Sequence, residues 1–231
     1  MSDTVRVLST LALKGAVHDL TSQYQAAGGA HIDADFAPTL ALLERLRAGE
    51  AADVVILTRE GLNEVAREAR VAAESCVDLA RSFVGIAVKA GVAHPDISTE
   101  VALRVALLGA RSVAYSRLGA SGILFAKLIE RLGIASDINA RAVIIPQGFT
   151  ADRLVTGEAD LAVQQISELK QVAGIDVVGP IPHQLQTPAV RRTNGGDEQA
   201  GRSRPAVAVS RFARGRASAA RQRAGALNFT P

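Results

Sequence analysis

A loop rich in glycine and serine lies between a short apolar run and an amphipathic helix near the middle of the chain. Residues 112–122 read SVAYSRLGASG, and ILFAKLIERLG follows directly. A strand-to-helix turn of this kind directs several backbone N–H groups and the positive end of a helix dipole at one point. Glycines there let a ligand approach the backbone closely. The pattern predicts binding of an anion or a small polar group by Ser116, Gly119, Ala120, Ser121 and Gly122. The alternative is an ordinary loop in which Ser121 only caps the helix.

Hydroxyl and amide side chains also follow several other apolar runs of the chain. Runs suited to strands cover residues 5–9, 31–37, 52–58, 83–91, 112–116, 142–146, 160–165 and 174–182. The candidate ligand-binding residues at the ends of these runs are Ser9, Thr10, Thr39, Gln147, Gln164 and Gln165. Helix capping by the hydroxyls, and exposure of Gln164 to solvent, are the competing interpretations.

Helical patterns separate most of the predicted strands. We expect helices at 13–27, 39–49, 60–81, 98–109, 121–133 and 149–157. The alternation predicts an α/β fold with mainly parallel sheets and helices on both faces. In such a fold a ligand lies beyond the carboxyl ends of the strands, which is where the polar residues fall.

Cysteine and histidine provide little evidence for catalysis or metal binding. The chain has one cysteine, Cys76, which excludes an internal disulfide framework and which we expect as a buried helix thiol. The four histidines do not have metal-ligand spacing. We also find no paired carboxylates or histidine–carboxylate pair at the strand ends. The prediction is therefore no metal, no cofactor and no assigned catalytic residue.

The basic character of the chain belongs to its last part. The net charge is +3, and residues 191–231 hold nine arginines against Asp197 and Glu198, a local balance of +7. Residues 1–190 are therefore mildly acidic, and we expect no specific nucleic-acid partner. We interpret 191–231 as an Arg-rich, poorly structured or aberrant tail. Nucleic-acid binding through this tail is a third hypothesis for function, and it rests on charge alone.

Four blocks carry a resemblance to a known family. They read VRVLSTLALKGAV, TLALLERLRAGEAADVVIL, YSRLGASGILFAKLIERLGI and VTGEADLAVQQISEL. In order and spacing the chain, over about residues 4–188, resembles the molybdate-binding type of type II periplasmic solute-binding proteins of ABC transporters. The resemblance implies a monomer with two α/β lobes, 1–82 plus 181–190 and 83–180. FVGIAV and GPIPHQL would be the strands that cross between the lobes, and the ligand would lie between them.

The chain departs from the family's pattern at several positions. Ala12 stands where the molybdate binders place a serine, and Gln165 stands where some carry a tyrosine. Thr39 matches their second serine. With Lys14 or Arg117 near the rim, this set favours a small organic acid over a tetrahedral oxyanion. The Arg-rich end departs too, and suggests a divergent or frame-shifted terminus.

The leading hypothesis for function is a solute-binding protein that captures a small anion, an organic acid or an oxyanion, for ABC-type uptake or sensing. An ABC transporter permease is the implied partner. The alternative is an isomerase of a small unsaturated carboxylic acid such as aconitate, which some proteins resembling this family are. That allylic proton shift would need a general base. No export signal is visible, so we expect a cytoplasmic protein as written, or a periplasmic one if the N-terminus is incomplete.

Overall fold

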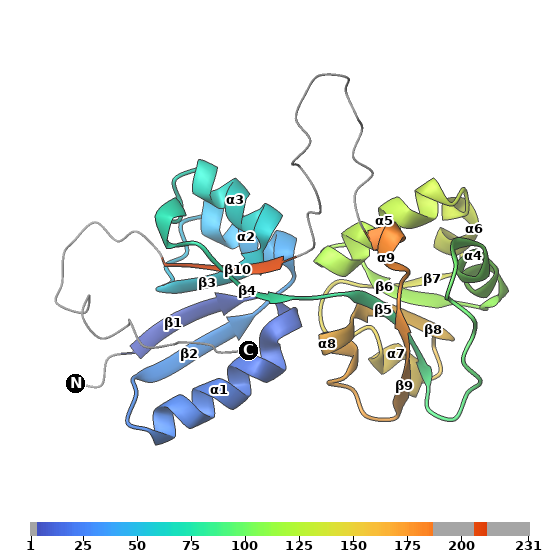
Figure 1. Cartoon of the computed structure of the whole chain (residues 1–231), viewed down its shortest axis with the longest axis horizontal. Coiled ribbons are helices and arrows are strands. Elements are labelled where there is room, and N and C mark those ends of the chain that lie inside the picture. The colour runs from blue at the N-terminus through green and yellow to red at the C-terminus, as the bar shows by residue number, and fades with distance from the viewer. Residues whose placement is uncertain (1–3, 187–205, 212–231) are drawn as a thin grey trace.

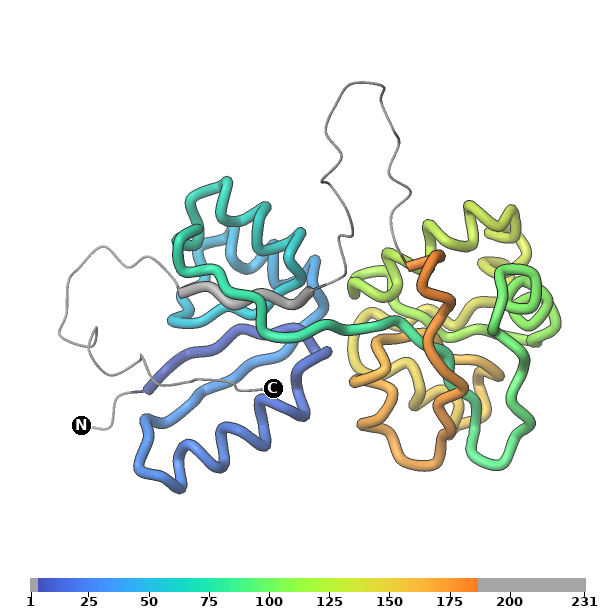
Figure 2. Tube along the Cα trace, in the orientation of Figure 1, coloured from blue at the N-terminus to red at the C-terminus, as the bar shows by residue number. Residues whose placement is uncertain are grey.

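Two five-stranded sheets, each packed with helices, form two lobes that lie side by side (Figure 1). The computed structural model describes residues 4–186 and, as backbone, 206–211. The strand order is β2-β1-β3-β10-β4 in the first lobe and β7-β6-β8-β5-β9 in the second. Figure 2 shows the chain passing directly from the first lobe to the second between β4 and β5.

The first lobe is built from both ends of the described chain. Its strands are β1 (Thr4–Ser9), β2 (His31–Phe36), β3 (Val54–Thr58), β4 (Val77–Arg81) and β10 (Ala206–Arg211). Its helices are η1 (Leu11–Leu13), α1 (Lys14–Ala26), α2 (Thr39–Arg47), α3 (Arg59–Arg67) and η2 (Ala73–Ser75). Leucines at helical spacing on α2 (Leu42, Leu43 and Leu46) are buried against the sheet, and this burial fixes α2 on it.

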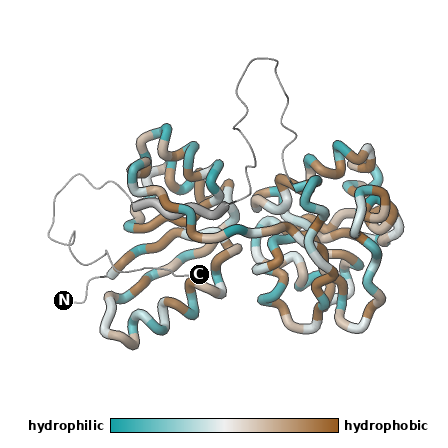
Figure 3. The backbone as a smooth tube through the Cα atoms, in the orientation of Figure 1, coloured by the Kyte–Doolittle hydropathy of each residue, from teal (hydrophilic) through white to brown (hydrophobic). Residues whose placement is uncertain are grey.

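The second lobe is continuous in sequence. Its strands are β5 (Val84–Lys89), β6 (Val113–Ser116), β7 (Ala142–Ile145), β8 (Leu161–Gln165) and β9 (Ile175–Pro180). Its helices are α4 (Glu100–Gly109), α5 (Ala120–Arg131), α6 (Ala135–Asn139), α7 (Asp152–Val155), α8 (Ile166–Leu169) and α9 (His183–Gln186). Tyr115 and Phe125 are fully buried with their rings edge to face, and they hold α5 on β6. In Figure 3 hydrophobic residues follow the strands of both lobes.

Each sheet combines a parallel part with an antiparallel part. β1 pairs in parallel with β2 and β3, and β6 with β7 and β8. β10 and β5 each pair antiparallel with both of their neighbours. The predicted α/β fold is confirmed, although the antiparallel strands make the sheets more mixed than the alternation of strands and helices indicates. The parallel strands β1, β3, β6 and β8 direct their carboxyl ends to the site described below.

Residues 60–81 do not form the predicted helices throughout. α3 ends at Arg67, the chain turns at Ala69 with a φ of 55°, and β4 follows at 77–81. Cys76 is half-buried between η2 and β4, so the prediction of a helix thiol is wrong. Among the described strands, β4 lies at the edge of the sheet and pairs with β10 alone, and neither run of residues reveals this pairing by itself.

The end of the chain also differs from the prediction. Ile181 and Leu185 pack in the core of the second lobe, so residues 181–186 do not belong to the first lobe. GPIPHQL does not cross between lobes over its described length, because Pro180 pairs with Gly85 and the Ile181 N–H donates to Val84. Residues 206–211, expected in a poorly structured tail, form β10 between β3 and β4. The rest of the predicted tail lies outside the described residues.

Candidate ligand-binding site

A cleft lies where the two lobes face each other, and loops of both lobes line it. It holds about 480 Å³ of empty space, part of which is open to solvent. The first lobe contributes Thr10, Leu11, Ala12, Pro38, Thr39 and Thr58. The second lobe contributes Ser116, Gly119, Ala120, Ser121, Gln147, Gly148, Gln164, Gln165 and Glu168.

The first-lobe side of the cleft consists of the segments that follow β1, β2 and β3. Thr10 is held in place because its N–H donates to the Ile56 carbonyl oxygen at 3.0 Å. Thr39 is the first residue of α2, and Pro38 precedes it as the cap, so the prediction of a Thr39 cap is wrong. Thr58 does cap a helix, because its Oγ1 accepts the Gly61 N–H at 3.2 Å. Thr10 and Thr39 are buried and line the cleft.

The loop between β6 and α5 forms the facing side. Gly119 is the N-cap of α5 and no side chain caps that helix, so the alternative in which Ser121 acts only as a cap is excluded. Ser116 Oγ accepts the Leu118 N–H at 3.2 Å and shapes the turn. A Cβ on Gly119 would have its nearest neighbours 3.9 Å away, which leaves room for a ligand. A Cβ on Gly122 would overlap the Ser116 carbonyl oxygen, so this glycine lets α5 pack directly on β6.

The two glutamines at the end of β8 position other parts of the cleft. Gln164 Oε1 accepts the Thr150 N–H at 2.7 Å, and its Nε2 donates to the Gly148 carbonyl oxygen at 3.0 Å. Gln164 therefore holds the loop after β7, and it is buried, which excludes the solvent-facing alternative. Gln165 Oε1 accepts the Ser82 hydroxyl at 2.7 Å, and Ser82 lies on the crossing between the lobes.

Glu168 is the one acidic or basic side chain among the residues that line the cleft in the described part of the chain. Only 6% of the residue is exposed. Its Oε2 accepts the Gln165 N–H at 3.2 Å, which completes a capping box on α8. Burial raises the pKa of Glu168 from 4.5 to about 7, although the hydrogen bonds from Gln165 and Gln164 oppose the rise.

Most of the predicted site residues meet in this cleft, and contact with a ligand stays a prediction for all of them. Ser9 and Gly122 do not line it. Ser9 is buried and its Oγ donates to the Thr10 carbonyl oxygen at 3.0 Å. Among the lining residues the prediction left out, only Glu168 carries a charge. Its spacing from Gln165, three residues at a strand-to-helix junction, is that of a capping box and was a usable signal.

The predicted rim cations have partners outside the cleft. Lys14 Nζ lies 5.5 Å from the centre of the Phe149 ring, which is a cation–π contact between the lobes. Arg117 donates to Asn139 Oδ1 at 3.5 Å. The Leu40 N–H also donates to the Leu118 carbonyl oxygen at 3.2 Å, again from one lobe to the other. The lobes are therefore in contact around the cleft.

Over the described residues, no helix is both long and apolar enough to cross a bilayer, and no acidic, histidine or cysteine cluster suits a metal ion. Two α/β lobes, with a polar cleft beyond the carboxyl ends of their parallel strands, define the fold of type II periplasmic binding proteins. The chain belongs to the family of bacterial extracellular solute-binding proteins, whose sequence model matches residues 5–223. That match runs well into the Arg-rich segment.

The chain is similar to a known protein in sequence and to solved structures in fold. An aconitate isomerase of Pseudomonas sp. is 38% identical over 189 residues, which are 79% of this chain and 72% of that protein. The periplasmic molybdate-binding protein of Azotobacter vinelandii shares the fold with a TM-score of 0.66 at 15% identity, covering 90% of this chain and 84% of its own. A tungstate ABC transporter protein of Geobacter sulfurreducens gives 0.62 at 12% identity, with 91% and 85% covered.

Proposed function

We propose that the cleft captures a small organic carboxylate and that the chain works as a solute-binding protein for that ligand. The observation that carries the proposal is the convergence of neutral donors on one cleft from both lobes. Thr10 and Thr39 approach from the first lobe, and the uncapped start of α5 approaches from the second. Such donors suit an anion that must bind and leave again. We propose an ABC transporter permease as its partner, through which the captured ligand would be taken up.

An organic acid fits the cleft better than a tetrahedral oxyanion. Ala12 lines the cleft and brings no hydroxyl, and the Gln165 amide oxygen is already engaged by Ser82. Leu11 and Pro38 add apolar surface, which suits a carbon skeleton. The relative named for aconitate supports an unsaturated carboxylic acid as the ligand class.

Thermal unfolding in the presence of a ligand panel tests this proposal. The panel is cis-aconitate, trans-aconitate, citrate, molybdate, tungstate and sulfate, each at the same concentration and ionic strength. A ligand at about 100 times its Kd stabilises the folded state by roughly 2.7 kcal/mol, which is a readily measured rise in Tm. We expect the rise with one or more of the carboxylates. No shift with any of them, or a shift with the tetrahedral oxyanions alone, would contradict the proposal.

A second candidate function is isomerisation of the bound acid, and Glu168 is the observation that favours it. An allylic shift removes a proton from one carbon, moves the double bond, and returns a proton to the far end of the allyl unit. A carboxyl group in the cleft with a pKa of about 7 is suited to take and return that proton near neutral pH. No cofactor or co-reactant is needed for the balance.

Conversion of cis-aconitate to trans-aconitate, followed by proton NMR, separates the two candidates. If the isomerase hypothesis holds, Glu168→Gln should lose turnover while it still binds the substrate. Tight binding without any turnover in the unmodified protein would leave a solute-binding protein only. The Glu44→Gln variant, changed at an exposed site on α2, is the matched control.

A further inference from the structure

We propose that Glu168 takes up a proton when an anion enters the cleft, and that its carboxyl O–H then serves as a donor to the bound anion. The proposal rests on the proposed function, because it takes the ligand to be a small carboxylate in this cleft. It adds that capture is coupled to protons, and it is an alternative to the isomerase role, which needs Glu168 ionised when the substrate is bound.

The composition of the cleft makes a second negative charge beside Glu168 unfavourable. No lysine, arginine or histidine belongs to the lining, over the residues that the structure describes, and Glu168 is its one acid. An anion entering this space would meet a buried carboxylate with no cation to offset the repulsion. Two like charges in one poorly hydrated site do not both stay ionised, so one of the groups holds a proton. Glu168 is the group more ready to hold it, because burial already raises its pKa above that of an ordinary carboxyl group.

The position of Glu168 allows it to be that group. The residue lines the cleft but is only 6% exposed, and one carboxyl oxygen, Oε2, is fixed by the Gln165 N–H. Neutral glutamic acid can keep this accepted bond and still donate one proton. The protonated side chain would therefore add a donor to the cleft and leave the α8 cap in place.

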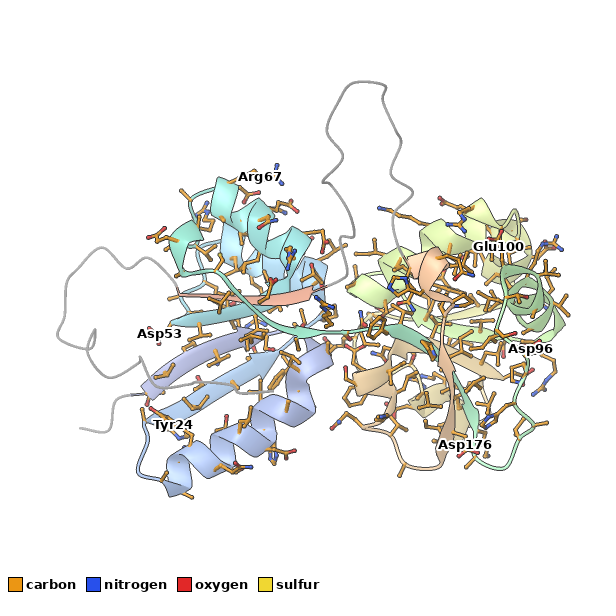
Figure 4. All side chains as sticks on the ribbon, in the orientation of Figure 1. Tyr24, Asp53, Arg67, Asp96, Glu100 and Asp176 are labelled. Atoms are coloured by element: carbon orange, nitrogen blue, oxygen red, sulfur yellow. The ribbon has the colours of Figure 1, made fainter. Side chains whose placement is uncertain are left out.

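On the described elements that pack most closely against α8, no charged group alters this conclusion. α8 packs against η1, α1, β5, β8 and β9. The titratable groups on those elements are Lys14, His18, Asp19, Tyr24, Lys89 and Asp176. None of them contributes to the pKa of Glu168, which is governed by burial and by the Gln165 and Gln164 hydrogen bonds. Figure 4 shows Tyr24 and Asp176 on the outer parts of their lobes, away from the facing sides.

The empty protein already lies close to the point of protonation. Burial raises the pKa of Glu168 to about 7, so its carboxyl group is protonated much more readily near neutral pH than an ordinary glutamate. An added anion raises that pKa further. Uptake should therefore be small at pH 5.5, where the acid is already protonated, and should approach about one proton per ligand at pH 8.

Calorimetric titration with trans-aconitate measures this uptake in two buffers of different ionisation heat at each pH: MES and Bis-Tris at pH 5.5, HEPES and Bis-Tris at pH 7, and HEPES and Tris at pH 8. The dependence of the binding heat on the buffer's own ionisation heat gives the number of protons. We expect close to one at pH 8 and close to none at pH 5.5. The affinity should fall about tenfold per pH unit above pH 7.

Glu168→Gln distinguishes the site from the rest of the protein. Glutamine keeps a donor and an acceptor in the same shape, so the variant should bind trans-aconitate with an affinity that does not change between pH 5.5 and 8, and without proton uptake. Glu44→Gln should behave like the unmodified protein. If the variant fails to fold, the buffer series on the unmodified protein still decides the question.

The possible failures are distinguishable. Binding at pH 5.5 and pH 8 with no buffer-dependent heat would leave the proposed function standing and overturn proton uptake. Uptake that persists in Glu168→Gln would assign the proton to another group and overturn the role of Glu168. No binding of cis-aconitate, trans-aconitate or citrate by either form at any pH would contradict the proposed function, and this inference with it.

Discussion

Replacing Glu168 with glutamine should make the ligand-free protein more stable at pH 8 and leave its stability almost unchanged at pH 4.5. The folded protein holds this carboxyl with a raised pKa of about 7, against an ordinary value of 4.5. The stabilisation that comes from holding the proton is therefore fully present below pH 4.5 and is lost as the pH rises through 7. Glutamine carries no ionisable proton, so the variant does not undergo this loss.

The size of the effect follows from the shift in pKa. Each pKa unit corresponds to about 1.36 kcal/mol, so a shift from 4.5 to about 7 amounts to roughly 3 kcal/mol between the two ends of the window. Exposed groups titrate alike in both proteins and cancel. The cap on α8 survives in the variant, because a glutamine side chain can also accept the Gln165 N–H.

Urea unfolding followed by circular dichroism at pH 4.5, 6 and 8 measures the difference in the free energy of unfolding. The gain of Glu168→Gln over the unmodified protein should grow steadily with pH across this window. Glu44→Gln, at an exposed position, should show no such trend. A difference that stays within about 0.5 kcal/mol at all three pH values, the usual range for surface changes, would refute the reasoning about Glu168.

Four further variants test the cleft and the first sheet. Gly119→Ala should fold normally but bind trans-aconitate more weakly, because its Cβ would project into the empty space of the cleft. Gly122→Ala should lose about 3 kcal/mol or more of its free energy of unfolding, because its Cβ would overlap the Ser116 carbonyl oxygen. Thermal melts and calorimetry separate these results, and equal melts would contradict the packing described for α5. Thr39→Val should lower the affinity about 2- to 10-fold at an unchanged Tm, the loss of one hydrogen bond. Unchanged affinity would remove Thr39 from the site. A chain that stops after Gln186 should lose the cooperative melting of the first lobe, because β3 and β4 lose the strand between them. A melt like that of the full chain would contradict the position of β10.

The sequence alone was enough to predict the α/β fold and most of the cleft. Polar residues that directly follow apolar runs, such as Thr10 after β1 and Gln164 in β8, could be placed together because parallel strands bring their carboxyl ends to one edge. The glycine loop before α5 was recognisable because its glycines and serines lie directly between an apolar run and an amphipathic helix. These patterns depend on neighbouring residues alone, so the folded protein keeps what they predict.

The features that could not be predicted depend on distant partners. β4 is a short strand whose one neighbour in the described part of the chain is β10, more than a hundred residues later. Residues 206–211 alternate as a strand does, but they lie among arginines and glycines. That composition predicts a poorly structured segment and hides one short strand. Glu168 lies on α8, which contacts η1 and α1 of the first lobe as well as β5, β8 and β9, and no run of neighbouring residues specifies these contacts. Ser9 is not among the residues that line the cleft, and its hydroxyl donates to the adjacent Thr10 carbonyl oxygen.

The place of β10 in the first sheet has a consequence for synthesis on the ribosome. All strands of the second lobe have been made once Gln186 emerges, so this lobe can fold while translation continues. The first lobe begins earlier but waits longer, because β3 and β4 have no strand between them until residues 206–211 are made. A nascent chain therefore exposes two unpaired strand edges during that interval, which are sites where chaperones or neighbouring chains can attach.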